Sequence, residues 1–212
     1  MFEKSVEELT ELGAQITTAE IAQQPELWRD TLNIYRENKE AIEAFLAEAR
    51  AMGEGRLSVV FTGAGTSDYV GDTCAPYLRH AGNTDLYDFK PIATTDIVSA
   101  PRDFLRAEDP TLVVSFARSG NSPESLAAVA VAKELVHNVK FLNITCAPEG
   151  KLAVESVDDP NALTLLIPRA NDKGFAMTGS YSCMTLLSTL IFDTASDEQK
   201  AEWVETIAKM GE

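Results

Sequence analysis

The chain has 212 residues, 45% of them hydrophobic, and is long enough to bury a substantial core in one large domain, alone or with a helical appendage. Its 33 acidic and 18 basic residues give a net charge of -15, which repels the phosphate backbone of nucleic acids and anionic membranes. We therefore expect no nucleic acid and no membrane among its partners. A phosphorylated small molecule is still allowed, because N–H groups at helix N-termini bind phosphate without a net positive charge on the protein.

The three cysteines, Cys74, Cys146 and Cys183, lie in apolar runs without C-x-x-C spacing, and we interpret them as buried thiols. No cluster of His, Cys and carboxylates has ligand spacing, so neither a metal nor another cofactor is expected. The start of the chain is acidic and lacks the features of a secretory signal, and no apolar run approaches the ~20 residues that cross a bilayer. These features predict a cytoplasmic protein.

Residues 1–52 are predicted to form a helical arm. Thr17 and Glu20 have the spacing of a capping box, and Gly53 ends the helical pattern. Apolar residues recur near a 3.6-residue period at Ile34, Ile42, Phe45 and Leu46.

Beyond Gly53, short apolar and β-branched runs alternate with segments of helical spacing. The runs are 57–62, 86–93, 112–116, 139–145 and 162–167. This alternation predicts a doubly wound α/β fold, in which a five-stranded parallel sheet lies inside a three-layer, flavodoxin-like sandwich. Two further helices are expected at about 175–192 and 196–210. Ligands of such sheets bind outside the carboxyl ends of the strands, so the loops at that edge are the candidates for a site.

The first candidate loop follows the run 57–62. Gly63 and Gly65 allow the backbone to approach a ligand, while Thr66 and Ser67 offer hydroxyls beside free N–H groups at a helix start. This combination predicts a cradle for an anion. Simple helix capping by Thr66 or Ser67 is the structural alternative. A dinucleotide site is a weaker alternative, because Asp68 occupies the position of the third glycine of that motif.

The second candidate loop spans 115–124 and contains a helix start of the same kind. Pro123 suits the first helical position, which makes Ser122 the N-cap and leaves Ser119, Gly120 and Asn121 in the preceding turn. Two helix starts that are able to bind an anion are therefore expected at one edge of the sheet.

Two charged side chains of the second loop allow more than one interpretation. Arg118 is suited to a charge-assisted bond to a phosphate or a sugar hydroxyl, or to pairing with a surface acid. Glu124 lies in the first helical turn, where the helix dipole stabilises a carboxylate, and it is a weak candidate for a catalytic base.

A third candidate segment, 169–180, follows the fifth run. Thr178 and Ser180 are expected to reach a ligand from a helix start, whereas Asp172 and Lys173 are expected to form a solvated turn. Thr94, in the loop after the second run, is interpreted as capping the turn that follows.

Several segments resemble the SIS, or sugar isomerase, domain, and most closely the tagatose-6-phosphate ketose/aldose isomerase and galactosamine-6-phosphate deaminase family. They are 62–67, 94–96, 115–125 and 174–178. The resemblance implies binding of the phosphate of a hexose or amino-hexose phosphate by Gly63, Gly65, Thr66, Ser67, Arg118, Ser119, Gly120, Asn121, Ser122, Thr178 and Ser180. Related domains often carry a serine in place of Ala117, so that contact is not transferred.

The family normally has two SIS domains in tandem, and the resemblance covers the first. It implies an arm at 1–52, a phosphosugar-binding domain at 53–195, and a C-terminal helix at 196–212 that leads toward a second domain. It also implies pairing into a homodimer or larger assembly.

Catalysis in comparable isomerases uses a glutamate and a histidine that come mainly from the second domain or a neighbouring subunit. The two histidines of this chain, His80 and His137, are predicted to lie at helix carboxyl ends, away from the phosphate loops. The resemblance thus implies an isomerase or deaminase whose base and ring-opening residue are not identified here. A non-catalytic sugar-phosphate sensor is the alternative, and a nicotinamide oxidoreductase is a third.

Overall fold

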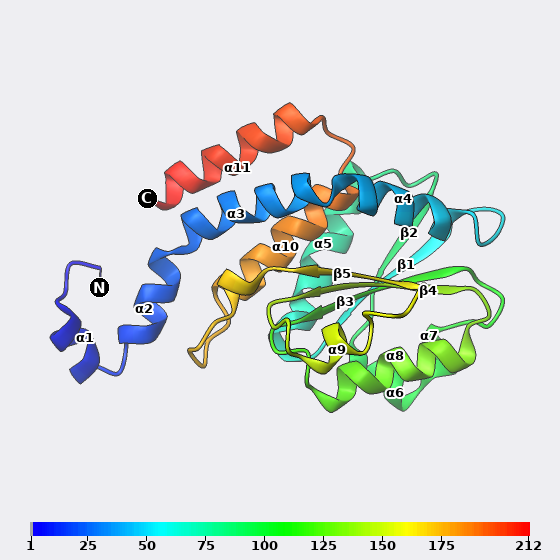
Figure 1. Cartoon of the computed structure of the whole chain (residues 1–212), viewed down its shortest axis with the longest axis horizontal. Helices are drawn as coiled ribbons and strands as arrows, with labels where there is room; N and C mark the ends of the chain where they lie inside the picture. The colour runs from blue at the N-terminus through cyan, green and yellow to red at the C-terminus, as the bar shows by residue number, and fades with distance from the viewer. Residues whose placement is uncertain (1) are drawn as a thin grey trace.

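A single five-stranded sheet lies at the centre of the computed structural model, which describes residues 2–212 (Figure 1). Its strands are β1 (Leu57–Gly63), β2 (Tyr87–Pro91), β3 (Thr111–Ala117), β4 (Val139–Thr145) and β5 (Ala162–Leu166). They pair in the order β2-β1-β3-β4-β5, and every pairing is parallel. The predicted doubly wound parallel sheet is confirmed.

Helices cover both faces of this sheet (Figure 1). One layer contains α3 (Gln24–Glu37), α4 (Lys39–Arg50), α5 (Asp68–Ala81) and α10 (Gly179–Phe192), and the other contains α6 (Thr94–Ser99), α7 (Pro101–Phe104) and α8 (Pro123–Leu135). Short segments η1 (Gly65–Ser67), α9 (Lys151–Val154) and η2 (Pro168–Ala170) lie in the loops. Because both faces are covered there, every residue of β1 and β3 is buried, whereas β5 at the sheet edge is mostly half-buried.

The N-terminal arm is helical, as predicted, and consists of α1 (Val6–Glu11), α2 (Gln15–Ala22), α3 and α4. The expected capping box at Thr17 and Glu20 is wrong. Gly13 adopts a φ of 64° and α2 begins at Gln15, so Thr17 lies inside the helix. The arm's capping box starts α1 instead, where the Glu8 N–H donates to Ser5 Oγ at 3.2 Å.

The last two helices differ in how well the sequence predicted them. Helix α11 (Asp197–Gly211) begins close to its expected position, with a capping box between Ser196 and Gln199. Helix α10 begins at Gly179 and not near 175, because the carboxylate of Asp172 accepts the Gly179 N–H at 3.1 Å and caps the helix there.

Figure 1 shows α1 and α2 extending from one end of the molecule, while α11 runs beside α3. Among residues 2–212, no helix has both the length and the apolar character that a bilayer crossing requires.

Candidate functional site

The candidate site lies where the chain leaves β1 and β3. These strands are neighbours, with Thr62 opposite Ser115 and Gly63 opposite Phe116. The helix that follows β1, α5, packs on one face of the sheet, and the helix that follows β3, α8, packs on the other. The two loops therefore diverge from one point of the sheet edge, which is where ligands bind in open α/β sheets.

The first loop turns sharply into helix. Gly65 has a φ of +60°, a conformation that a side chain makes unfavourable, and a Cβ added to Gly63 would lie 2.5 Å from the backbone of Ser67. A side chain from another part of the chain also holds this loop, because Thr94 Oγ1 donates to the Gly63 carbonyl at 2.9 Å. Thr94 therefore does not cap the next turn, as expected from the sequence. It is the first residue of α6, and its hydroxyl stabilises the first loop instead.

Ser67 occupies the N-cap position of α5, but its side chain makes no capping hydrogen bond. The capping alternative for this serine is therefore wrong, and its hydroxyl remains for another partner. The next residue, Asp68, brings a negative charge near the helix start. Partial burial raises the pKa of Asp68, and the nearby carboxylates of Asp72 and Asp96 raise it further.

The second loop has the predicted helix start, with Ser122 at the N-cap and Pro123 at the first helical position of α8. The Ser122 hydroxyl does not cap the helix. It shares a hydrogen bond of 2.6 Å with the Ser125 hydroxyl one turn later. Because both N-caps lack side-chain capping bonds, the N-terminal ends of α5 and α8 keep N–H groups available for an anion.

Contacts with the loop after β4 hold the second loop in place. The Lys151 N–H donates to Asn121 Oδ1 at 3.1 Å, and the Leu152 N–H donates to the Gly120 carbonyl at 3.0 Å. Gly120 itself has a φ of +66°. The Asn121 side chain thus has a structural partner, in addition to the role that the resemblance implies for this residue.

A small hollow of about 120 Å³ lies between the two loops. It brings together five of the predicted binding residues: Ser67, Arg118, Ser119, Gly120 and Ser122. Predicted residues outside its lining are Gly63, Gly65, Thr66, Asn121, Thr178 and Ser180. The lining residues that were not predicted as site residues are Ala64, Phe116, Ala117, Ser125 and Met177.

Arg118 extends from the second loop to the third candidate segment. Its guanidinium donates to the carbonyl oxygens of Asp172 at 3.0 Å and Gly174 at 3.2 Å. The alternative in which Arg118 pairs with a surface acid is therefore wrong, because its protein partners are backbone carbonyls. It also lines the hollow, so contact with a ligand stays a prediction.

Asp172 is buried and does not belong to a solvated turn, contrary to expectation. Its carboxylate accepts the N–H groups of Thr178 at 3.0 Å and Ser180 at 2.8 Å. The hydroxyls of Thr178 and Ser180 donate to the same carboxylate at 3.2 Å and 2.5 Å. These two hydroxyls therefore have a partner within the chain, and their binding of a ligand stays a prediction.

The groups considered for acid–base chemistry lie outside the hollow. Glu124 is exposed in the first turn of α8. His80 is exposed in the last turn of α5, and His137 is exposed after α8, with its Nδ1 3.4 Å from a carboxylate oxygen of Glu108. Both histidines lie at helix carboxyl ends, at the edge of the sheet away from the hollow, as predicted.

The three cysteines are buried, also as predicted, and burial raises the pKa of the Cys74 and Cys183 thiols to about 11. A thiol with so high a pKa is a poor nucleophile near neutral pH.

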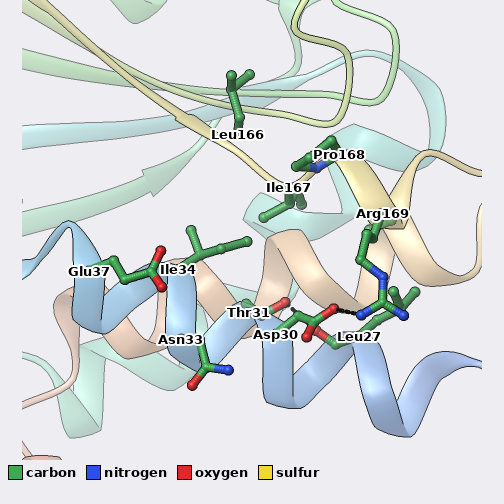
Figure 2. Close-up of a pocket in the computed structure, with 11 residues that line it drawn as sticks. Leu27, Asp30, Thr31, Asn33, Ile34, Glu37, Leu166, Ile167, Pro168 and Arg169 are labelled. Carbon is green, nitrogen blue, oxygen red and sulfur yellow. Dashed lines mark hydrogen bonds and ion pairs between the residues drawn. The ribbon is translucent and has the colours of Figure 1, made fainter.

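A larger groove of about 450 Å³ lies between α3 and the end of β5 (Figure 2). Leu27 and Ile34 of α3 line it with Ile167, and Arg169 forms an ion pair with Asp30 at its rim. Its walls are mainly apolar, unlike the serine-lined hollow. We therefore assign the candidate site to the hollow.

No protein-family model matches the chain. The chain is 42% identical to the D-galactosamine-6-phosphate deaminase AgaS of Shewanella sp. (strain ANA-3), over 89% of its own length and 48% of that protein. Its fold matches a structure from Clostridium novyi NT, provisionally assigned as a tagatose-6-phosphate ketose/aldose isomerase, with a TM-score of 0.89, 42% identity, and coverage of 99% of this chain and 52% of that one. The tagatose-6-phosphate ketose/aldose isomerase of Escherichia coli gives a TM-score of 0.80 at 34% identity, with 91% of this chain and 52% of that chain covered. The chain thus spans about half the length of the relatives that it matches.

Proposed function

We propose that the chain is a phosphosugar-binding domain that acts on galactosamine 6-phosphate or tagatose 6-phosphate. The chain has the SIS phosphosugar isomerase fold, and it is homologous to about half the length of sugar-phosphate deaminases and isomerases. The observation that carries this proposal is the hollow between the first and second loops. Serine hydroxyls and two helix N-termini converge there, at the point where β1 and β3 diverge.

The chemistry of the hollow suits a phosphate group. Ser67, Ser119 and Ser122 offer hydroxyls, and the N-terminal ends of α5 and α8 offer N–H groups and the positive ends of their helix dipoles. This explains how a chain with a net charge of -15 binds an anion. Gly65 and Gly120 set the turns that present these groups. The remaining predicted residues, including Thr66, Thr178 and Ser180, belong to the proposal through the family resemblance.

Ketose/aldose isomerisation needs a base that moves a proton between adjacent carbons and a group that opens the ring, whereas deamination also releases ammonia. The residues that line the hollow supply binding but include no histidine and no carboxylate. We therefore assign phosphate binding to this chain, with Glu124 as a weak candidate for the base.

The proposal is tested by calorimetry with galactosamine 6-phosphate and tagatose 6-phosphate. Ser119→Ala and Ser67→Ala should each weaken binding by about 1–3 kcal/mol, the range for removing a hydrogen-bond partner of a charged group. Ser99→Ala is the matched control, because Ser99 is exposed at the end of α6 and its hydroxyl donates to the backbone carbonyl of Asp96 in its own helix. Unchanged affinity in both site variants would contradict the assignment.

Two rival functions are separated from the proposed one by different measurements. A sugar-phosphate sensor would bind through the same serines, and only assays of turnover separate it from an enzyme domain. A nicotinamide oxidoreductase would bind NADH in preference to a hexose 6-phosphate. The negative charge of Asp68 at the start of α5 disfavours binding of the NADH pyrophosphate.

We also propose that the chain acts in the cytoplasm and self-associates through its arm. The arm exposes the apolar side chains of Phe2, Val6, Leu12 and Ile16, which a partner chain could cover. Within the proposed organisation, residues 1–52 form the arm, 53–195 the binding domain and 196–212 a helix toward a second domain. Light scattering should give a dimer or a larger species.

A further inference from the structure

The N-terminal arm reaches the candidate site through one buried carboxylate. Glu20 of α2 is only 7% exposed, and its Oε1 accepts the N–H groups of Lys173 at 2.5 Å and Gly174 at 2.9 Å. These partners lie 153 and 154 residues further along the chain. Helix α2 is thereby attached to the segment between β5 and α10.

Arg118 holds the same turn through its carbonyl groups. It donates to the carbonyl oxygens of Asp172 and Gly174, while Glu20 accepts from the N–H groups of Lys173 and Gly174. The turn 172–174 is therefore bonded by a cation at its carbonyl oxygens and by an anion at its N–H groups. Charge-assisted bonds of this kind are about twice as strong as those between neutral groups.

The fit between Glu20 and the turn is close. A Cβ added to Gly174 would lie 2.6 Å from Glu20 Oε2, so a side chain at position 174 requires either the Glu20 carboxylate or the turn to shift. Within residues 2–212, Glu20 forms no ion pair. Burying a carboxylate is costly unless its hydrogen bonds compensate, so the energy of Glu20 depends on this turn.

Met177 lines the hollow and is half-buried. In the chain it follows the turn 172–174 by three residues and directly precedes Thr178, whose N–H donates to the Asp172 carboxylate, as does the N–H of Ser180. We propose that Glu20 is a positioning residue of the phosphosugar site: by holding the turn 172–174, the arm keeps Met177 against the hollow. This inference rests on the proposed function of the hollow.

The test compares Glu20→Ala and Glu20→Gln with wild type, using calorimetry with galactosamine 6-phosphate and residue-resolved amide exchange. In Glu20→Ala, the amides of Lys173 and Gly174 should exchange faster, and affinity should fall by about tenfold. Glu20→Gln keeps an oxygen that accepts both N–H groups and should restore most of the protection and affinity. Glu11→Ala, which removes an exposed acid of α1, should change neither quantity.

Gly174→Ala tests the same contact from the other side and keeps the inference testable if Glu20→Ala folds poorly. It should also weaken binding, and combining it with Glu20→Ala should cost less than the sum of the two changes, because the shorter side chain removes the clash. Faster exchange at 173 and 174 with unchanged affinity would overturn the positioning role, and so would additive effects of the two substitutions. If wild type binds no phosphosugar, the proposed function fails instead, while the exchange data still report on the contact.

Discussion

At the scale of single residues, Thr62 and Thr94 form a matched pair beside the first loop. Both are 1% exposed. Thr94 Oγ1 donates to the Gly63 carbonyl, whereas Thr62 Oγ1 is buried without a hydrogen-bond partner in the part of the chain that the structure describes. Thr94→Val should therefore lower the free energy of unfolding by about 1–3 kcal/mol, and the isosteric Thr62→Val should be neutral or stabilising. Denaturant unfolding of both variants measures this difference. An equal loss in Thr62→Val would show that its hydroxyl is bonded, for example to a buried water.

The distance along the chain between interacting residues explains which residues the sequence predicted well. Ser122 and Pro123 were placed correctly, because a proline at the first helical position follows a local rule. The partners of Arg118 lie 54 and 56 residues further along, and the partner of Thr94 lies 31 residues back. No local pattern specifies such contacts. The interpretations of Arg118 and Thr94 in terms of nearby partners therefore proved wrong.

At the scale of elements, ion pairs attach α11 to α3 and α4. Arg29 of α3 bonds both carboxylate oxygens of Glu205, at 2.9 Å and 3.1 Å, and Lys39 of α4 pairs with Asp197. These hydrogen bonds lower the pKa values of Glu205 and Asp197. A carboxylate with a lowered pKa stabilises the folded state above its unfolded pKa, near 4, and that stabilisation is lost as the pH falls through the folded pKa.

Arg29→Ala should therefore lower the free energy of unfolding at neutral pH, and only slightly, because water screens ion pairs at the surface. The effect should shrink in high salt and below about pH 4. Arg36→Ala is the control, since Arg36 is an exposed arginine of the same helix without an ion pair among the described residues. Melting curves at several pH values measure the difference, and an effect that persists undiminished at pH 3 would refute the electrostatic origin.

The strands were predictable because burial on both faces makes their apolar runs nearly continuous. Helix starts were less predictable. Helix α10 begins where Asp172 caps it from six to eight residues upstream, a spacing that ordinary capping patterns do not include. In the arm, Glu20 matched a capping pattern by spacing alone, and its carboxylate is instead bonded to the turn 172–174.

At the scale of the whole molecule, the arrangement predicts binding without efficient turnover. His80 and His137 lie at the far edge of the sheet, and Glu124 is exposed outside the hollow. General acid–base groups each contribute about 10²- to 10⁴-fold to rates, so this chain should bind galactosamine 6-phosphate and show little isomerisation or ammonia release. Steady-state assays check this, with the Shewanella deaminase as the positive control. Full activity that is lost in Glu124→Gln would identify Glu124 as the base.

The pairing of β1 with β3 also has a consequence for how the protein folds. Helix α5, strand β2 and helices α6 and α7 all intervene between these two strands, so their contacts are non-local and close a long loop. Forming such a pairing costs loop-closure entropy before it yields stabilising contacts, so we expect this pairing to form late in folding. The hollow between the two loops forms only after this pairing. A bound phosphosugar should therefore leave the folding rate unchanged and lower the unfolding rate.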